Sequence, residues 1–215
     1  MAEEAGALVL DEVAISLGGR PLLALTLRVA PGEIVAVMGP SGSGKSTLLA
    51  AICGGLDPAF SMTGRITLDG TRIDALPPER RGVGILFQDD LLFPHLSVGA
   101  NLGFGLAAQV KGRAARRARI EAALASAGLE GLADRDPATL SGGERARVSL
   151  LRVLLSQPRA LLLDEPFSKL DLGLRARFRA FVFAELARHR LPALLATHDR
   201  AVAVAAGARI VELGA

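Results

Sequence analysis

Tryptophan and tyrosine are absent from this chain of 215 residues, and Cys53 is its one cysteine. A single cysteine cannot form a disulfide within the chain, which excludes a disulfide-stapled fold. No stretch of about 18 consecutive apolar residues occurs, so we expect no helix that spans a bilayer. Half of the residues are hydrophobic and 22% are charged, which is typical of a globular protein with a sizeable core.

Lysine is scarce too, because Lys45, Lys111 and Lys169 are the only ones and arginine supplies the other positive charges. The formal net charge of +3 is too small an excess to indicate nucleic-acid binding, and no nucleic-acid partner is expected. The N-terminal segment begins with acids rather than with the basic and then apolar regions of a secretory signal.

Strand and helix patterns alternate along the chain. Apolar runs and alternation predict strands at 8–15, 23–29, 33–38, 64–68, 83–87, 160–163, 193–196 and 208–213. Helical patterns cover about 44–53, 113–127, 144–155, 172–190 and 200–206. This order predicts an α/β fold with a mostly parallel sheet, helices on both of its faces, and a helical lobe inserted in the middle.

A glycine-rich loop follows the buried strand 33–38. It consists of Gly39, Pro40, Ser41, Gly42, Ser43, Gly44, Lys45 and Ser46, which fits the phosphate-loop pattern G-x-x-x-x-G-K-[ST] between a strand and a helix. The glycines let successive N–H groups point at one anion, and the helix start adds partial positive charge. Lys45 is expected to reach the β- and γ-phosphates, and Ser46 to supply a hydroxyl to Mg²⁺. An ordinary glycine-rich turn is the alternative, which the flanking strand and helix disfavour.

Polar residues follow three predicted strands. Asp164 and Glu165 end the apolar run 161–163, at the sheet edge where ligands bind in open α/β folds. There Asp164 would hold the Mg²⁺ shell and Glu165 could polarise the attacking water. Gln88 could ligate the metal or that water, and His198 could contact the γ-phosphate. Taken singly, Gln88 could be an ordinary polar residue at the end of a strand, and a lone histidine such as His198 is more often structural.

A second anion site is predicted where the segment Leu140–Glu144 opens a helix. Its Ser-Gly-Gly start resembles the first site in kind. One nucleotide has no evident use for two such sites in one molecule, whereas two protomers facing head to tail would each offer the second site to the other's γ-phosphate. The plain alternative is Ser141 as an N-cap, with glycines for the turn.

The resemblance rests on the order of these elements along the chain, which is 39–46, Gln88, Leu140–Glu144, 161–165, 168–171 and His198. In this order they resemble the ATP-binding cassette (ABC) superfamily over essentially the whole chain. The resemblance implies a P-loop NTPase spanning 5–215. Its RecA-like lobe would cover 5–88 and 158–215, with an N-terminal antiparallel β lobe, and its helical lobe about 89–157. It implies ATP and Mg²⁺ as cofactors, bound between the two subunits of a homodimer or of a pair of ABC ATPases.

The resemblance also assigns roles to residues. Phosphates and Mg²⁺ would be bound by Lys45, Ser46 and Thr47, with Ser46, Gln88 and Asp164 as metal ligands. Glu165 would be the catalytic base and His198 the γ-phosphate switch, with Gln88 as the third catalytic residue. The partner's nucleotide would be contacted by Ser141, Gly142, Gly143 and Glu144, and Asp171 would belong to the loop that links the two sites.

The segment 89–106 resembles the part of importer ATPases that binds the membrane subunit, most of all in uptake systems for sulfate, iron, polyamines or thiamine. Phe93, Pro94 and Leu96 would line the groove that grips a membrane-subunit helix; an ordinary apolar loop is the alternative. The expected partners are transmembrane permease subunits and a solute-binding protein, and the expected location is the cytoplasmic face of the cell membrane, as a peripheral subunit. Efflux or lipid-release ATPases, non-transport ABC ATPases and P-loop kinases are the rival classes.

Four features depart from the family pattern or stand outside it. Leu17 occupies the place of the aromatic residue that usually stacks on adenine, so we predict weaker nucleotide binding and a looser preference for ATP over GTP. Glu144 stands where glutamine is commoner, and Lys169 where a small residue is usual, which we interpret as a solvated variant. The basic run at 111–119 (Lys111, Arg113, Arg116, Arg117 and Arg119) is a solvated helix face or, alternatively, a lipid-headgroup contact.

Overall fold

The computed structural model of the chain describes residues 6–214, except for the side chain of Leu172. The described chain falls into two compact units. The first runs to Ile85 and resumes with Arg159–Glu165 and from Leu186 onward, and the second comprises Leu86–Pro158 and Pro166–Glu185. The predicted α/β class is confirmed. The second unit takes in 166–185, which the sequence prediction assigned to the RecA-like lobe, and the predicted lobe boundaries remain a prediction.

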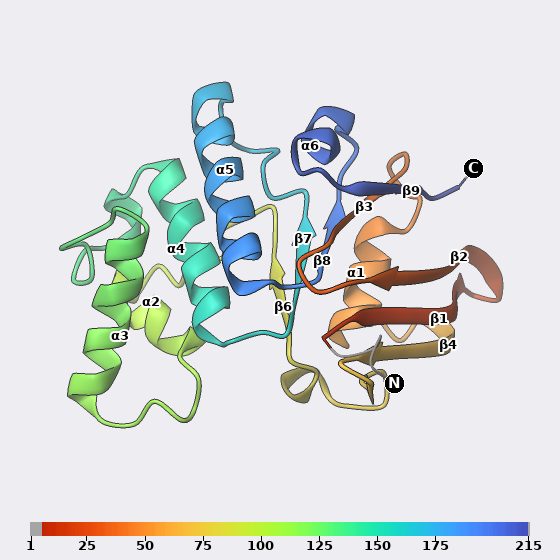
Figure 1. Cartoon of the computed structure of the whole chain (residues 1–215), viewed down its shortest axis with the longest axis horizontal. Helices are drawn as coiled ribbons and strands as arrows, with labels where there is room; N and C mark the ends of the chain where they lie inside the picture. The colour runs from red at the N-terminus through yellow and green to blue at the C-terminus, as the bar shows by residue number, and fades with distance from the viewer. Residues whose placement is uncertain (1–5, 215) are drawn as a thin grey trace. The chain divides into compact units, whose positions relative to one another are not determined.

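The first unit contains a four-stranded antiparallel sheet. Its strands are β1 (Leu8–Leu17), β2 (Arg20–Val29), β4 (Phe60–Leu68) and β5 (Thr71–Arg72), in the spatial order β2-β1-β4-β5. Figure 1 shows the first three of these side by side. Gly18 and Gly19 both have positive φ, the backbone that a tight hairpin between β1 and β2 requires. The register of β1 shifts between Leu10 and Val13, so that its apolar side chains stay on the buried face.

The same unit contains a five-stranded sheet. It is formed by β3 (Ile34–Met38), β6 (Val83–Leu86), β7 (Ala160–Asp164), β8 (Ala193–Ala196) and β9 (Arg209–Glu212), in the order β6-β7-β8-β3-β9. Strand β3 pairs in parallel with β8 and with β9, and β7 pairs in parallel with β8. A short 3₁₀ turn, η2 (Pro78–Arg80), precedes β6. The parallel register places the carboxyl ends of β3, β7 and β8 at one edge, where the candidate site lies.

Helices cover both faces of this sheet. Val35 and Val37 of β3 belong to the main core cluster together with Leu48 and other side chains of α1 (Lys45–Cys53). The alternate β3 residues, Ala36 and Met38, pack with Ala203 of α6 (Arg200–Ala205). Because successive strand residues point to opposite faces, α1 and α6 lie on opposite sides of β3, and the strand is apolar throughout.

The second unit is helical. It contains α2 (Val98–Gly105), α3 (Arg113–Ser126), the 3₁₀ turn η3 (Pro137–Thr139), α4 (Gly142–Leu155) and most of α5 (Leu172–His189) (Figure 1). A separate apolar core joins α2, α3 and α4, with Phe181 of α5 packed against it. Helices α2 and α4 touch closely, since a Cβ on Gly105 would stand 1.9 Å from the backbone oxygen of Arg152.

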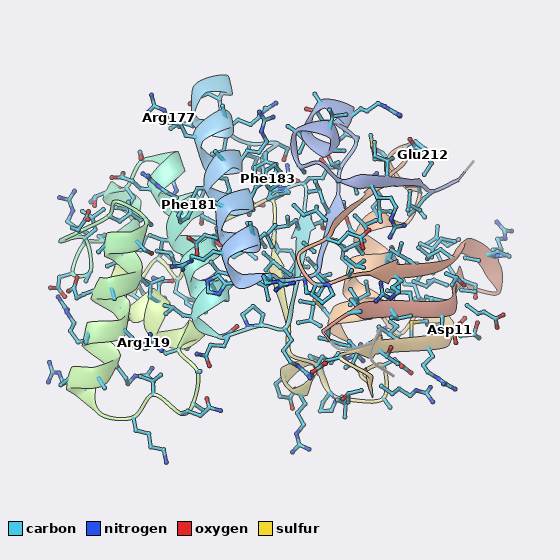
Figure 2. The ribbon with its side chains drawn as sticks, in the orientation of Figure 1. Asp11, Arg119, Arg177, Phe181, Phe183 and Glu212 are labelled. Carbon is cyan, nitrogen blue, oxygen red and sulfur yellow. The ribbon has the colours of Figure 1, made fainter. Side chains whose placement is uncertain are left out.

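Charged side chains cover the outer faces of these helices, as Arg119 on α3 and Arg177 on α5 illustrate (Figure 2). Part of the basic run is not simply solvated. Arg117 forms ion pairs with Glu121 and Asp134, and Arg116 donates to the carbonyl oxygens of Gly103 and Val110. Over the described residues, no helix combines the length and the hydropathy needed to cross a membrane.

Candidate nucleotide-binding site

The phosphate loop connects β3 to α1 within the first unit. Gly44, directly before α1, has a φ of 91°, and a Cβ there would lie 2.7 Å from Cδ2 of Leu23. A Cβ on Gly39 would lie 2.6 Å from Oγ of Ser43 and 2.8 Å from the backbone oxygen of Leu213. The tight packing and the left-handed backbone both require glycine, so the loop is closely wound around its own backbone.

The start of α1 has the features of an anion site. Within the described chain, Gly44 provides no side-chain cap to this helix, and the first turn of α1 carries no acidic residue. Its first N–H groups and its partial positive charge therefore remain available to a ligand. The hydroxyl of Ser43, in the same loop, is buried and has no hydrogen-bond partner among residues 6–214. A phosphate group bound by the loop would satisfy these donors.

Lys45 adds a full charge to the loop. Its side chain is almost completely buried, and Nζ donates to the backbone oxygens of Gly39 at 2.7 Å and Pro40 at 3.0 Å. The flanking loop therefore holds the ammonium group in place, and the charge is sited where the phosphates are expected. Thr47, two residues further along α1, is half-buried.

Ser46 and Asp164 come together although they are far apart in the sequence. The Ser46 hydroxyl donates to Oδ1 of Asp164 at 3.1 Å, which links the start of α1 to the end of β7. Burial raises the pKa of Asp164 and the neighbouring charge of Glu165 raises it further, while the hydrogen bond from Ser46 lowers it. A cation bound here would relieve the cost of the buried carboxylate.

This hydroxyl–carboxylate pair suits the hard oxygen chemistry of Mg²⁺, which usually takes one or two carboxylates together with substrate phosphates. No group of three or more His, Cys, Asp or Glu side chains in the described part of the chain is placed to hold a metal ion. A Mg²⁺ ion at this site would therefore depend on nucleotide oxygens and water as well as on Ser46 and Asp164.

Glu165 and His198 form the second pair at this sheet edge. Oε1 of Glu165 and Nδ1 of His198 lie 3.0 Å apart, and the Glu165 side chain is 25% exposed, whereas that of His198 is 66% exposed. Glu165 has a φ of 44°, a left-handed backbone that is unusual for a residue other than glycine. Its N–H donates to the oxygen of Ala196 at 3.0 Å, and this bond helps to hold the turn that aims the carboxylate at His198.

Leu17 lies at the end of β1 and is 47% exposed. Its exposed aliphatic surface can bury part of a base, without the stacking that an aromatic ring offers. Leu17, the residue expected to contact adenine, is therefore an accessible apolar side chain.

The start of α4 belongs to the second unit and carries the other predicted anion site. Ser141 is the N-cap of α4 and forms a reciprocal capping box with Glu144. Gly143 packs against Leu174, since a Cβ there would lie 3.0 Å from its Cδ2. Asp171 accepts the N–H of Leu174 at 2.9 Å, so that it caps the start of α5. Ser141 therefore acts as the N-cap of α4, which was the plain alternative in the sequence analysis.

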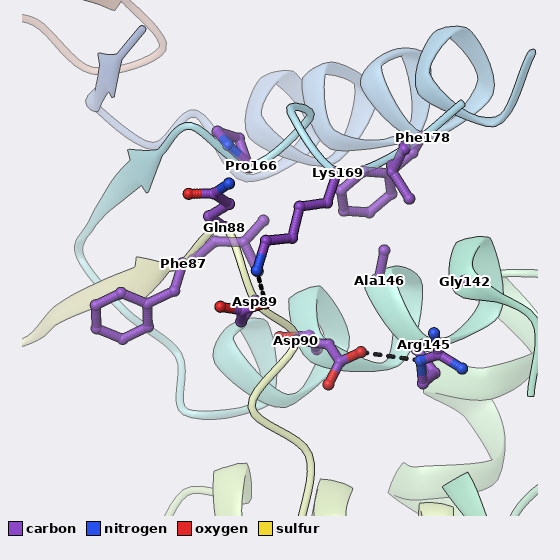
Figure 3. A pocket seen from close by; sticks show the side chains of 13 residues that line it. Phe87, Gln88, Asp89, Asp90, Gly142, Arg145, Ala146, Pro166, Lys169 and Phe178 are labelled. Atoms are coloured by element: carbon purple, nitrogen blue, oxygen red, sulfur yellow. Dashed lines mark hydrogen bonds and ion pairs between the residues drawn. The ribbon is translucent and has the colours of Figure 1, made fainter. Parts of the chain in front are cut away.

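A small polar pocket of the second unit contains Gln88 in its lining (Figure 3). Lys169 forms an ion pair with Asp89, so it is not merely a solvated substitute for a small residue. Arg145 bonds Oδ2 of Asp90 at 3.0 Å and the backbone oxygen of Leu140 at 2.9 Å. Arg145 therefore ties the segment that follows Gln88 to the start of α4.

Two residues whose contacts were not predicted from the sequence, although Arg152 was placed on the helix after Leu140–Glu144, organise the neighbouring loop. Asn101 is fully buried, and its amide accepts from the N–H of Phe93 and donates to the oxygens of Phe93, Leu96 and Ser97. Arg152 donates to the oxygens of Asp90 and Leu91, and its guanidinium lies 5.7 Å from the ring centroid of Phe93. An asparagine within an apolar helical segment was the one signal that the sequence offered for Asn101, and no local pattern indicates the contacts of Arg152.

The structure thus brings the predicted site residues together in two sets. The first unit holds the phosphate loop with Thr47 and Leu17, the Ser46–Asp164 pair and the Glu165–His198 pair. The second unit holds Gln88, the capped start of α4 at Ser141–Glu144, and Asp171 at the start of α5. The first set can bind a triphosphate and polarise a water, and the second offers a helix start and amide groups.

The fold and these motifs define the chain as a P-loop ATPase of the ABC transporter family, to which it belongs. The ABC transporter family model matches residues 22–168, more than half of the chain. The chain binds ATP and is an ATPase, as members of this family are.

Relatives show the same family. The chain is 54% identical over 180 residues to the uncharacterized ABC transporter ATP-binding protein YnjD of Escherichia coli, covering 84% of this chain and 82% of that protein. It is 43% identical over 209 residues to the Fe(3+) ions import ATP-binding protein FbpC of Streptomyces avermitilis, covering 97% and 60%. It is 42% identical over 203 residues to the putative 2-aminoethylphosphonate import ATP-binding protein PhnT of Salmonella choleraesuis, covering 92% and 53%. The chain therefore spans little more than half the length of the two import proteins.

Proposed function

We propose that this ATPase works as a dimer beneath separate transmembrane permease subunits, at the inner face of the cell membrane, and drives solute import. The observation that carries the proposal is the phosphate loop of the first unit, with Ser46–Asp164 and Glu165–His198 at the same sheet edge. The import direction rests on the names of relatives such as the iron and 2-aminoethylphosphonate import proteins. A solute-binding protein would deliver the cargo.

In the proposed cycle, the loop at Gly39–Ser46 holds the phosphates and Lys45 neutralises their charge. Glu165 accepts a proton from the attacking water, and His198, beside it, contacts the γ-phosphate. Gln88 would contact the same water or the metal. Ser46 and Asp164 would hold a Mg²⁺ ion, which supplies charge neutralisation for the phosphate oxygens.

The second half of the site would come from the partner subunit. Ser141, Gly142, Gly143 and Glu144 at the start of α4 would contact the partner's nucleotide, and Asp171 would lie in the loop between the two sites. Two ATP molecules would then hold two subunits together, and hydrolysis would release them because the bridging γ-phosphate is lost. Closure would pull on the attached permease helices.

The permease is proposed to dock on the loop that includes Phe93, Pro94 and Leu96. Large apolar side chains are exposed here: Leu91, Phe93 and Phe104 are 53%, 38% and 69% exposed. The rings of Phe93 and Phe104 also contact each other at a tilt, with their centroids 4.9 Å apart. Because Asn101 fixes the backbone of this loop, its apolar surface is preorganised for a partner.

The test is the variant Glu165→Gln, which keeps the side-chain volume and removes the base. We expect at least a hundredfold slower hydrolysis, on the scale of losing a key catalytic group, and a dimer with Mg-ATP that is stable in gel filtration. A Glu165→Gln variant that stays monomeric with Mg-ATP and hydrolyses at the parent rate would contradict the proposal. The variant Glu130→Gln, an equal charge change at an exposed residue, is the control.

A further inference from the structure

The first residue of the α4 start, Ser141, is fully engaged by one side chain. Oε2 of Glu144 accepts the Ser141 N–H at 2.7 Å and the Ser141 hydroxyl at 2.6 Å. In return, the Glu144 N–H donates to Oγ of Ser141 at 3.3 Å. These hydrogen bonds lower the pKa of Glu144, and the charges of Arg147 and Arg135 contribute to the lowering, so the side chain is a carboxylate at neutral pH.

The hydroxyl of a serine has one proton to donate. Here that proton points to Glu144, and an ionised carboxylate accepts hydrogen bonds but donates none. Ser141 therefore has no side-chain donor left for a phosphate oxygen as long as the capping box is closed.

We propose that Glu144 acts as an autoinhibitory residue, which occupies the Ser141 donors in the resting subunit and must release them before α4 can bind the partner's γ-phosphate. The inference rests on the proposed function, since it assumes that Ser141 contacts the nucleotide of a second subunit. It concerns how readily that contact forms, not whether ATP binds to the phosphate loop.

The negative charge of Glu144 also opposes phosphate binding at Ser141, as the occupied hydroxyl proton does. A phosphate oxygen that approached Oγ of Ser141 to hydrogen-bond distance would lie at most about 5.4 Å from the carboxylate oxygen already bonded to that hydroxyl, since each contact spans about 2.7 Å. Two like charges so close repel one another, and the Glu144 carboxylate already interacts favourably with the α4 N-terminus. The arriving phosphate must therefore replace a charge that is in place.

A glutamine at this position would behave differently. Its carbonyl oxygen can accept the Ser141 N–H, as in the S/T-x-x-E/Q capping box, so the helix start stays capped. Its amide carries no charge and can donate to Oγ of Ser141, which leaves the hydroxyl proton free for phosphate. The variant Glu144→Gln thus separates the inhibitory role of Glu144 from its structural role.

The experiment measures ATP-driven dimer formation in the Glu165→Gln background, by sedimentation over a range of Mg-ATP concentrations. Adding Glu144→Gln is expected to lower the ATP concentration for half-maximal dimer formation by about three- to tenfold, the scale of the net contribution of one ordinary hydrogen bond. Thermal unfolding without nucleotide is expected to change little, because the cap is kept. Glu130→Gln, with the same charge change at an exposed position, is expected to leave the ATP requirement unchanged.

Repeating the comparison with Ser141→Ala separates this inference from the proposed function. If Ser141→Ala weakens the dimer and abolishes the gain from Glu144→Gln, the inference holds. If Ser141→Ala weakens the dimer but Glu144→Gln gives no gain, or gives the same gain without the hydroxyl, the autoinhibitory role is wrong and the proposed function stands. If Ser141→Ala leaves the dimer unaffected, both the contact between subunits and the inference are contradicted.

Discussion

The starts of helices α1 and α4 are both glycine-rich, yet they differ in what already occupies them. In the described chain, the first turn of α1 carries no acid, Gly44 offers no side-chain cap, and the buried Lys45 adds positive charge. At the start of α4, the Ser141 hydroxyl oxygen accepts the Glu144 N–H, and the Glu144 carboxylate accepts the N–H and the hydroxyl of Ser141. A helix start is a ready anion site only where its own side chains leave it open. We therefore expect substitutions at α1 to abolish nucleotide chemistry and those at α4 to tune it.

The largest effect is expected from Lys45→Ala at the α1 start. Loss of the buried ammonium group removes the charge placed for the phosphates, and hydrolysis should fall by about 10²–10³-fold, as when a preorganised charge-stabilising donor is removed. Steady-state phosphate release measures this. Lys169→Ala, which removes a half-exposed lysine that pairs with Asp89, serves as the control and is expected to retain far more activity. Equal losses of hydrolysis in Lys45→Ala and Lys169→Ala would contradict a special role for the lysine at the start of α1.

The glycines that precede or open the two helices should also differ. At Gly44, a Cβ would collide with Leu23 on a left-handed backbone, so Gly44→Ala should lower the free energy of unfolding by about 1–3 kcal/mol. At Gly142, the nearest atom to a Cβ is an Arg145 nitrogen at 4.0 Å, so Gly142→Ala should change stability by less than about 0.5 kcal/mol. Urea unfolding measures both. Similar destabilisation by the two alanine substitutions would show that the loop before α1 is no more tightly packed than the start of α4.

Leu17→Tyr extends the comparison to the base end of the nucleotide. An aromatic ring at the exposed end of β1 should strengthen ATP binding by about 1–3 kcal/mol, the range found for stacking on bases. We also expect the preference for ATP over GTP to rise, which competition between the two nucleotides measures. Leu17→Met, which stays aliphatic, is the matched control. Equal discrimination by the parent and by Leu17→Tyr would mean that Leu17 lies outside the base site.

The smallest effect is expected for the ion pair between Asp90 and Arg145, which ties the α4 start to the segment after Gln88 (Figure 3). Their side chains are 33% and 39% exposed, so solvent and salt screen the pair. A double-mutant cycle with Asp90→Asn and Arg145→Gln should give a coupling of about 0.2–1 kcal/mol in the free energy of unfolding. The coupling should shrink as ionic strength rises. A value that salt does not change would mean that Arg145 acts through the oxygen of Leu140 instead.

The elements that the sequence predicted well are those with a local pattern. The phosphate loop, the apolar run before Asp164 and the alternation of strands and helices are each contained in a few consecutive residues, and the α/β class followed from them. The S-x-x-E spacing of Ser141 and Glu144 also indicates a capping box. Only the N-cap role of Ser141 was predicted, and the reciprocal hydrogen bond to the Glu144 side chain was not.

What could not be predicted depends on contacts between distant residues. Lys169 and Asp89 are 80 positions apart, and no local pattern pairs them. The left-handed backbone of Glu165 arises from its position after β7, where its N–H bonds to Ala196 of β8. Burial of Asn101 likewise follows from the packing of a loop on α2. Tertiary context sets such features, and single-sequence patterns do not contain it.

The central claim is that the phosphate loop of one copy meets the α4 start of another, and cysteine crosslinking tests it most directly. Ser41→Cys and Ser141→Cys would be combined with Cys53→Ser, in the Glu165→Gln background, and oxidised with and without Mg-ATP. We predict a disulfide-linked dimer that forms only with Mg-ATP. It should also form when the Ser41→Cys and Ser141→Cys chains are made separately and mixed. A crosslink that forms only within single molecules, or that ignores ATP, would contradict the account.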